Sequence, residues 1–187
     1  MPESGRSTFE NCDYQSGNCG WHNVQSDDFD WVLGTGAAPS KMGPSHDHTT
    51  ENYDKSGHYV YMQSSGQSPG NIAILESSVF RVPPFSNGQC KVRFFYHMYG
   101  KHVFRLQLDV REVCREANVS RTIIWNRFRR VKRNEWVYYV APLVNISGSF
   151  VLRFTAFVGY LSEKGDIAVD DISLSPECFS SGNRFLL

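Results

Sequence analysis

The sequence predicts an all-β protein built from two packed antiparallel sheets. Ten short runs are apolar or alternate between apolar and polar residues, and Gly, Pro, Ser or Asn separates them, which is typical of strands joined by turns. No segment carries an apolar stripe at helical spacing over three turns. Aromatic residues make up 14% of the chain, which also favours strands. Strands without helices bury their apolar faces by packing sheet against sheet.

The first five predicted strands are bounded by turn residues. The third follows Pro69 and Gly70, which turn the chain into it. The longest irregular stretch, from Gly34 to Gly57, separates the first two strands, and long ordered loops on sandwiches commonly hold recognition or ion sites. The five strands are predicted at residues 30–33, 58–63, 71–76, 78–82 and 89–97.

The last five predicted strands complete the two sheets. One of them begins just after Asn134, which turns the chain. These strands are predicted at residues 103–111, 122–127, 135–141, 150–157 and 166–174.

The final predicted strand contains two adjacent acids, Asp170 and Asp171, within an otherwise apolar run. Strand alternation places Asp170 on one face together with Ile172 and Leu174. It places Asp171 on the opposite face. A carboxylate in an apolar setting needs a cation, an Arg or backbone N–H donors, so each face must supply a partner for its charge.

Length and charge restrict the organisation and the partners. The 187 residues fit one large domain, predicted at 9–179 between a disordered amino-terminal segment, 1–8, and a disordered tail, 180–187.

Because 19 basic residues balance 19 acidic ones, global charge indicates no nucleic-acid partner. No run of about 20 apolar residues occurs, so we expect no membrane insertion. The first ten residues lack the pattern of a secretory signal, and we expect a fragment of a longer protein.

The cysteines favour disulfide bonds over a metal or redox site. No Cys-x-x-Cys pair occurs among Cys12, Cys19, Cys90, Cys114 and Cys178, which argues against structural zinc and a thioredoxin-like pair. Two Asn-x-Ser glycosylation sequons begin at Asn118 and Asn145. Together these features predict an extracellular chain, either secreted or part of an ectodomain. The alternative is a cytosolic protein with reduced thiols.

Two short motifs suggest chemistry but have simpler explanations. Residues 66–70, Gly-Gln-Ser-Pro-Gly, match the nucleophile elbow of hydrolases, which needs a strand before Ser68 and a helix after it. A strand-like run follows instead, so a turn is predicted. His46 and His48 flank Asp47, yet no further zinc ligands occur at a recognisable spacing. We therefore expect polar loop residues here, and no catalytic residues in this chain.

Six motifs, spread from Phe9 to Cys178, resemble the MAM domain, a family named for meprin, neuropilin and the receptor tyrosine phosphatase mu. The resemblance implies a jelly-roll β-sandwich, found in extracellular regions of receptors, adhesion proteins and proteases. The motifs are Cys12-Asp13-Tyr14 with Cys19-Gly20-Trp21, Asp27-Asp28-Phe29-Asp30-Trp31, Gly43-Pro44-Ser45-His46-Asp47-His48-Thr49, Phe95-Tyr96-His97-Met98-Tyr99-Gly100, and residues 165–174 followed by Cys178.

The resemblance also implies a disulfide pattern. It pairs Cys12 with Cys19 and Cys90 with Cys178. Cys114 lies outside the four-cysteine pattern of the family. An extra cysteine links subunits in some relatives, so Cys114 is a candidate intermolecular thiol. The alternative is an unpaired cysteine at a strand edge.

A structural calcium ion is the cofactor that similar jelly rolls suggest. Some of them hold the ion with oxygens from the first strand, a loop and the last strand, and calcium takes about six to eight such ligands. The candidate ligands here are Gln15, Asp47 and Asp170, with Asp171 as a substitute. Where many family members have Phe-Glu, this chain has Tyr14-Gln15, so a calcium site would be weaker by one charge.

The last-strand acids have two alternatives to calcium. One is an ion pair with an arginine, for which Arg93, Arg105 and Arg153 are the candidates. The other is that the carboxylates cap backbone N–H groups in a turn.

Residues 127–133 form the one dense basic run. Its charge predicts a glycosaminoglycan or an acidic partner, and its dibasic sequence resembles a convertase cleavage site. The alternative is a solvated hairpin in which Phe128 and Val131 point inward. The candidate basic patch comprises Arg127, Arg129, Arg130, Lys132 and Arg133.

The four tryptophans are candidates for stacking on sugars, as in carbohydrate-binding jelly rolls. Trp31 and Trp136 lie in apolar alternation and are predicted to be core residues instead. The other two are Trp21 and Trp125.

These observations predict a non-catalytic extracellular recognition module. It would mediate protein–protein adhesion or dimerisation for a larger receptor, adhesion protein or protease, by homophilic or heterophilic contact. The alternative function is a carbohydrate- or glycosaminoglycan-binding module on the same sandwich.

Overall fold

The computed structural model describes residues 11–39, 42–50, 56–81, 88–100, 103–113, 121–129, 133–146, 148–160 and 165–179. Within these ranges the chain forms eleven strands and one short 3-10 helix, Pro176–Cys178. The predicted disordered ends, 1–8 and 180–187, lie outside the described residues. So do Cys114, Asn118, Arg130, Val131 and Lys132.

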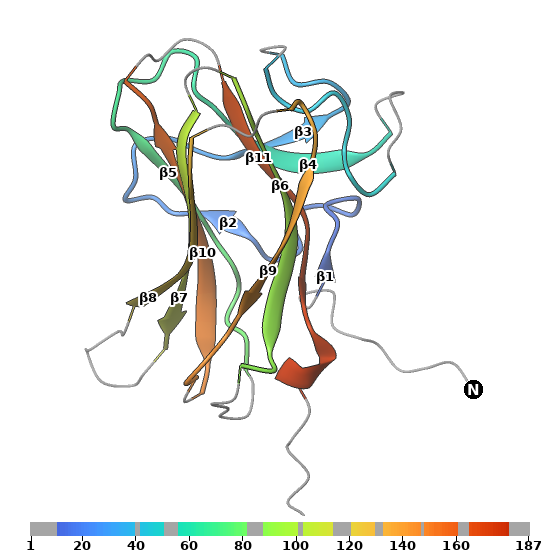
Figure 1. The fold of residues 1–187 in the computed structure, drawn as a ribbon, viewed down its shortest axis with the longest axis vertical. Helices are drawn as coiled ribbons and strands as arrows, with labels where there is room; N and C mark the ends of the chain where they lie inside the picture. Colours follow the sequence, from blue (N-terminus) through green and yellow to red (C-terminus); the bar gives the residue numbers. More distant parts are fainter. Residues whose placement is uncertain are drawn as a thin grey trace, which may run out of the picture.

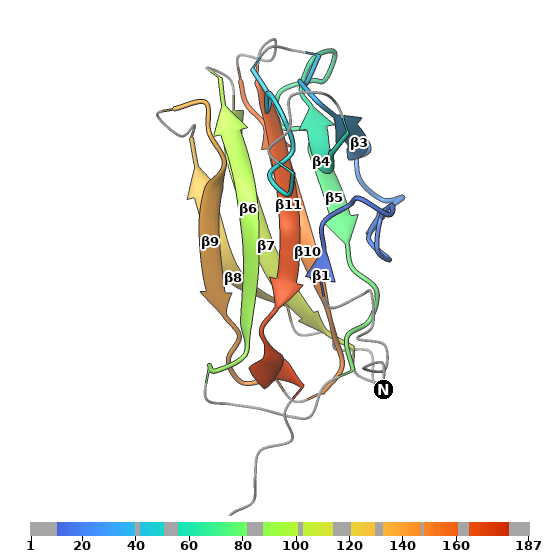
Figure 2. The same cartoon turned by 90° about the vertical axis from the view of Figure 1, so that its right-hand side faces the viewer.

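Sheet A holds the first and last strands of the chain. Its order is β3-β4-β11-β6-β9, and β1 pairs with the far end of β11 (Figure 2). All of these pairs are antiparallel. The strands are β1 (Asn11–Cys12), β3 (Val32–Thr35), β4 (His58–Gln63), β6 (Lys91–Tyr99), β9 (Val137–Pro142) and β11 (Asp166–Leu174).

Sheet B packs against sheet A and is also antiparallel throughout (Figure 1). Its order is β2-β5-β10-β7-β8. The two sheets confirm the predicted all-β sandwich of jelly-roll type. The strands of sheet B are β2 (His22–Asn23), β5 (Ile72–Glu76), β7 (Val103–Glu112), β8 (Arg121–Phe128) and β10 (Phe150–Val158).

The predicted strands mostly agree with the structure. The strands at 58–63 and 166–174 have the predicted bounds, and most of the others differ by one or two residues at their ends. The prediction at 78–82 is wrong in its described part, where only an isolated bridge joins Phe80 to Phe150. Serine side chains take up some of the backbone hydrogen bonds that a regular strand pair would use. Leu152 N donates to Ser77 Oγ, and Ser78 Oγ donates to Gly20 O. The two-residue strands β1 and β2 were not predicted, since such short strands carry no period.

Aromatic side chains fill the space between the sheets. The Phe94 ring lies 5.0 Å from Phe154 and 5.2 Å from Trp125. Trp31 is 4% exposed, and its Nε1 donates to Ala73 O at 3.1 Å. The partner for the indole N–H removes the penalty of burying it. Trp31 is therefore a core residue, as predicted.

A bulge in β11 changes the faces predicted for its acids. The register with β6 shifts between Asp170 and Ser173, and Asp171 has a φ of 48°. The extra residue restarts the alternation, so Ile172 and Leu174 lie in the core with the first half of the strand. The predicted grouping of Asp170 with these two residues is therefore wrong. Asp170 faces away from the core, and Asp171 is the bulged residue.

Candidate functional site

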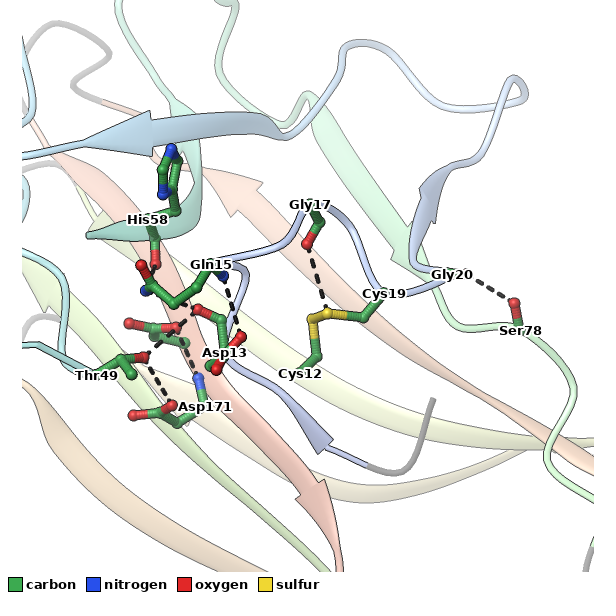
Figure 3. Close-up of a disulfide and its surroundings, with 11 residues drawn as sticks. Cys12, Asp13, Gln15, Gly17, Cys19, Gly20, Thr49, His58, Ser78 and Asp171 are labelled. Carbon is green, nitrogen blue, oxygen red and sulfur yellow. Dashed lines mark hydrogen bonds between the residues drawn. A yellow bond between two sulfur atoms is a disulfide. The ribbon is translucent and has the colours of Figure 1, made fainter. Parts of the chain in front are cut away.

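Two disulfides hold the ends of the domain. The structure joins Cys12 to Cys19 and Cys90 to Cys178, the pairing that the family resemblance implies. The first bridge closes the tight turn that carries Gln15 (Figure 3). The second links the start of β6 to the helix that follows β11, across 88 positions of sequence. Both bridges restrict the unfolded chain and so stabilise the fold.

The outer face of sheet A, turned away from sheet B, is covered by residues 36–39 and 42–50, which we call the covering loop. The Tyr59 hydroxyl donates to Gly36 O at 3.0 Å, and Trp136 Nε1 donates to His46 O at 2.9 Å. The His48 ring stacks on Phe95 with centroids 3.3 Å apart. Aromatic side chains of the sheet thus hold the loop along its length. Trp136 packs against Tyr59, Tyr61 and Ala168 on this outer face, rather than between the sheets.

Two glycines allow the chain to approach this face closely. A Cβ on Gly57 would lie 1.9 Å from the Asp47 carboxyl carbon. A Cβ on Gly43 would lie 2.4 Å from that of Ala38 and 3.0 Å from Asp166 Oδ2. Only glycine fits at both positions, so the sequence fixes the placement of the covering loop and of Asp47 within it.

Two carboxylates are buried where the covering loop packs on β11, one from the loop and one from the strand. Asp47 and Asp170 are both 0% exposed. Asp47 accepts from Thr50 N at 2.7 Å and from Thr50 Oγ1 at 2.8 Å. Asp170 accepts from His48 N and from Asp171 N, both at 2.8 Å. Backbone N–H groups therefore compensate part of the charge, which is one of the two alternatives expected for Asp170.

The arginines proposed as counter-charges lie elsewhere. Arg93 Nη2 donates to Leu174 O, Arg105 Nη2 to the Gln107 side chain, and Arg153 pairs with Glu76. None of the ion pairs formed by the described residues joins an arginine or a lysine to Asp47 or Asp170.

Burial raises the pKa of Asp170 to about 8, and the Asp171 carboxylate adds to the rise. Asp47 contributes in the same direction, whereas the N–H groups of His48 and Asp171 oppose it. A group with this environment favours either a proton or a cation beside it.

Gln15 completes the cluster from the disulfide turn. Its Nε2 lies 3.0 Å from Asp13 O, 3.3 Å from His58 O and 3.4 Å from Asp47 Oδ2. Three oxygens thus converge on a single amide group. Figure 3 labels Gln15 with two of these neighbours, Asp13 and His58. A rotation of the amide by 180° would present its oxygen to the same position instead.

Asp171 lies at the edge of the cluster and is bonded to the covering loop. Its carboxylate accepts from Thr49 Oγ1 at 2.9 Å and lies 2.5 Å from His48 Nδ1. A cavity of about 290 Å³ beside it is lined by Asn11, Cys12, Asp13, Thr49, Asp171, Ile172 and Ser173.

The structure places Gln15, Asp47 and Asp170 in one cluster with Asp171 at its edge, and the oxygens around Gln15 are of the types that a hard cation takes. Two carboxylates, the rotated Gln15 amide and the carbonyls of Asp13 and His58 are ligand types that calcium takes. In the part of the chain that the structure describes, no three His, Cys, Asp or Glu side chains converge on one metal position. A site here therefore depends on Gln15 and on main-chain oxygens.

The sequence matches the model of the family described as MAM domain, meprin/A5/mu over residues 12–179. The chain belongs to the MAM domain family. MAM domain-containing glycosylphosphatidylinositol anchor protein 1 of Rattus norvegicus is 34% identical over 169 residues, covering 86% of this chain and 16% of that protein. MAM domain-containing protein 2 of Mus musculus is 30% identical, covering 87% of this chain and 22% of that protein. This MAM domain thus spans a small part of each relative's length.

Solved structures with the same fold include carbohydrate-binding and adhesin modules. TmCBM61 in complex with β-1,4-galactotriose has a TM-score of 0.54 at 14% identity, covering 91% of this chain and 99% of that one. The K2 cleaved adhesin domain of Lys-gingipain has a TM-score of 0.53 at 13% identity, covering 83% of this chain and 90% of that one. These similarities confirm the β-sandwich.

Family membership and two disulfides make this MAM domain an extracellular module. Asn145, the described sequon asparagine, has a φ of 55° and is exposed. Its side chain is thus accessible for glycosylation, which stays a prediction. No described helix has the length and apolarity of a membrane span.

The remaining predicted sites have different surroundings. Arg127, Arg129 and Arg133 are exposed. Phe128 was expected to point inward, but it is 50% exposed, so that expectation is wrong. It lies on the outer face of an edge strand, where Phe104 and Arg105 cover only part of its ring. Ser68 lies in a turn closed by a hydrogen bond from Asn71 N to Ser68 O, as expected.

The outer face of sheet B, turned away from sheet A, was not singled out by the sequence; we call it the open face. On β7, Arg105, Gln107 and Asp109 alternate with core leucines and so point outward. Gln107 Nε2 donates to Asp109 Oδ1 at 3.1 Å, and Arg121 Nη2 donates to the same oxygen at 2.9 Å. Polar residues at every second position of β7 are the signal that predicts such a face.

Proposed function

We propose that this MAM domain is a non-catalytic recognition module that mediates protein–protein contact, including contact with a second copy of itself. Family membership carries the proposal, since the relatives hold the module as one part of a longer protein. The edge strand β9 supports it, because Tyr138 and Tyr139 are 50% and 37% exposed there. Val144, just beyond the strand, is 48% exposed. Exposed tyrosines are enriched at protein interfaces.

Sedimentation equilibrium with and without reductant tests self-association. We expect a dimer that Tyr138→Ser weakens and that Val32→Ser, at the opposite edge of sheet A, leaves unchanged. Val32 is 45% exposed, so both changes remove a similarly exposed apolar side chain. A non-reducing gel of the Cys114→Ser variant separates a covalent link from a non-covalent one. A monomer at every concentration contradicts homophilic contact.

We propose that the Gln15, Asp47 and Asp170 cluster binds a structural calcium ion, with Asp171 as a substitute ligand. The raised pKa of Asp170 and the three oxygens around the Gln15 amide support this. The ion would fix the covering loop against β11 and the disulfide turn. Thermal unfolding in calcium and in chelator tests the proposal, because a ligand that binds only the folded state raises the midpoint. An unchanged midpoint at every calcium concentration contradicts it.

Glycan binding is the second candidate function. The exposed arginines of the basic run favour it, and the fold is shared with a module solved in complex with a galactotriose. Heparin-column elution of the wild type and of Lys132→Ser/Arg133→Ser provides the test. Elution at the same salt concentration would argue against a role for these two residues.

A further inference from the structure

One end of the open face combines aromatic rings with an arginine that its neighbours hold in place. The Arg105 guanidinium carbon lies 4.9 Å from the ring centroid of Phe128 and 4.9 Å from that of Phe157. Arg105 Nη2 also donates to the side-chain oxygen of Gln107. A guanidinium between two rings and bonded to a neighbour is already oriented, which lowers the entropic cost of binding an anion.

Three aromatic side chains at this end are exposed to solvent. Phe104 is 37% exposed, Phe128 50% and Tyr160 83%. The Phe104 ring contacts both of the others, with centroids 6.1 Å from Phe128 and 6.3 Å from Tyr160. Because folded domains rarely expose contiguous apolar surface without a use, this cluster indicates a binding surface.

A second arginine adjoins the cluster through its backbone. Arg129 N donates to Phe104 O at 2.7 Å, and the Arg129 side chain is exposed. The ion pairs of the described residues that involve arginine use Arg121 and Arg153, not Arg105 or Arg129. The charge of these two guanidinium groups therefore favours an anionic partner.

We propose that this end of the open face, formed by Phe104, Arg105, Phe128, Arg129 and Tyr160, binds a sulfated glycan. The inference rests on glycan binding as the second candidate function and assigns it a site and a ligand class. Guanidinium groups match the oxygens of sulfate as they match carboxylate and phosphate. The aromatic rings offer flat apolar surfaces to the C–H faces of the sugars. An extended acidic peptide is the competing occupant, because β8 is an edge strand that offers main-chain partners, and the test below must exclude it.

Strand alternation supplies a matched control. In the β7–β8 register, Phe128 pairs with Arg105 and Arg127 with Leu106, so the Phe128 and Arg127 side chains point to opposite sides of β8. Burial raises the pKa of Tyr96, and the Arg127 guanidinium opposes that rise, which places Arg127 towards sheet A. Arg129 carries the same charge but lies beyond the end of β8, with a φ of 66°. Its backbone N bonds to Phe104 O, so of the two arginines Arg129 is the one bonded to a residue of the proposed site.

Equilibrium binding to heparin, desulfated heparin and poly-L-glutamate tests the site. We expect Arg129→Ser and Phe128→Ala each to weaken heparin binding about fivefold, and Arg127→Ser to weaken it less than about twofold. Phe128→Ala leaves net charge unchanged, so its effect reports the aromatic contact. Tyr160→Ala provides the same readout at a more exposed position. Thermal midpoints of the variants show that the fold is retained.

Each outcome decides a different point. Equal losses in Arg127→Ser and Arg129→Ser, or no loss in both Phe128→Ala and Tyr160→Ala, overturn the site while glycan binding stands. Absence of heparin binding by the wild type overturns the second candidate function as well. Poly-L-glutamate binding as tight as heparin binding overturns the sulfated glycan in favour of an acidic peptide.

Discussion

The two outer faces of the sandwich use the same strand geometry for opposite purposes. On sheet A, aromatic residues face outward and the covering loop packs on them, so Tyr59 is 0% exposed although it lies outside the main core. On sheet B, arginines and polar side chains bond to one another, and Ile123 and Phe128 stay half exposed. The contrast indicates that the first face stabilises the fold, whereas the second is available to a partner.

Removing an aromatic side chain from the covered face should have the largest effect. Tyr59→Ala leaves a cavity beneath the covering loop and Gly36 O without its donor, at a cost of about 3–5 kcal/mol in the free energy of unfolding. Tyr138→Ala is the matched control, since Tyr138 lies on the same sheet but is 50% exposed. Urea denaturation measures both. Similar small losses for the two variants would show that the loop contributes little stability.

Acid should destabilise the folded protein through His97, which is buried beside Trp136 on the outer face of sheet A. Burial lowers the pKa of His97 to about 4, against 6.5 for an exposed histidine, although the bond between its Nε2 and Asn134 opposes the shift. The unfolded chain therefore takes up this proton first as the pH falls. The stabilising contribution is fully present above about pH 6.5 and is lost as the pH falls through about 4, by at most about 3 kcal/mol.

Urea midpoints at pH 7 and pH 4.5, in chelator, measure this dependence. We expect His97→Gln to reduce the difference between the two midpoints, because glutamine does not titrate. His22→Gln is the control on sheet B, where the imidazole is 58% exposed. An equal reduction in both variants contradicts the assignment to His97.

The sequence predicts the sandwich and most of the strands, because period-2 patterns and turn residues are local signals. The four candidate calcium ligands could be named through the resemblance to similar jelly rolls. The structure places Gln15 beside Asp47, with Asp170 near them and Asp171 at the edge, and calcium binding stays a prediction. What could not be predicted is the bulge at Asp171. One extra residue in a strand leaves no mark in the composition of β11, yet it decides which face Ile172 and Leu174 occupy.

The outer face of sheet B was missed for a different reason. Gln107 and Asp109 alternate regularly with leucines, as in any half-exposed strand, and the sequence does not show that they are 2% and 0% exposed. Their burial arises from neighbouring strands, which bring Arg121 onto Asp109 from β8. Cross-strand register, unlike periodicity, depends on the whole fold.

A carboxylate at position 15 should strengthen calcium binding, if residue 15 is a ligand of the proposed ion on the covered face. Gln15→Glu places a third carboxylate near Asp47 and Asp170, so the variant loses stability in chelator and gains more from calcium. We expect calcium affinity to rise about tenfold, equivalent to about 1.4 kcal/mol. Calorimetric titration measures the affinity, and Gln25→Glu, at an exposed position, controls for the added charge. Equal affinities in the two variants would contradict a ligand role for residue 15.

The smallest effect is expected on the open face, and it tests whether that face is open. Ile123 is 49% exposed and pairs across β8 and β7 with Asp109. Ile123→Thr keeps the β-branched side chain that strands favour, and it removes little buried surface. The free energy of unfolding should change by less than about 0.5 kcal/mol. A loss above about 2 kcal/mol would show that Ile123 is buried in the folded protein, as Tyr59 is, because only a buried apolar side chain gives so large a change.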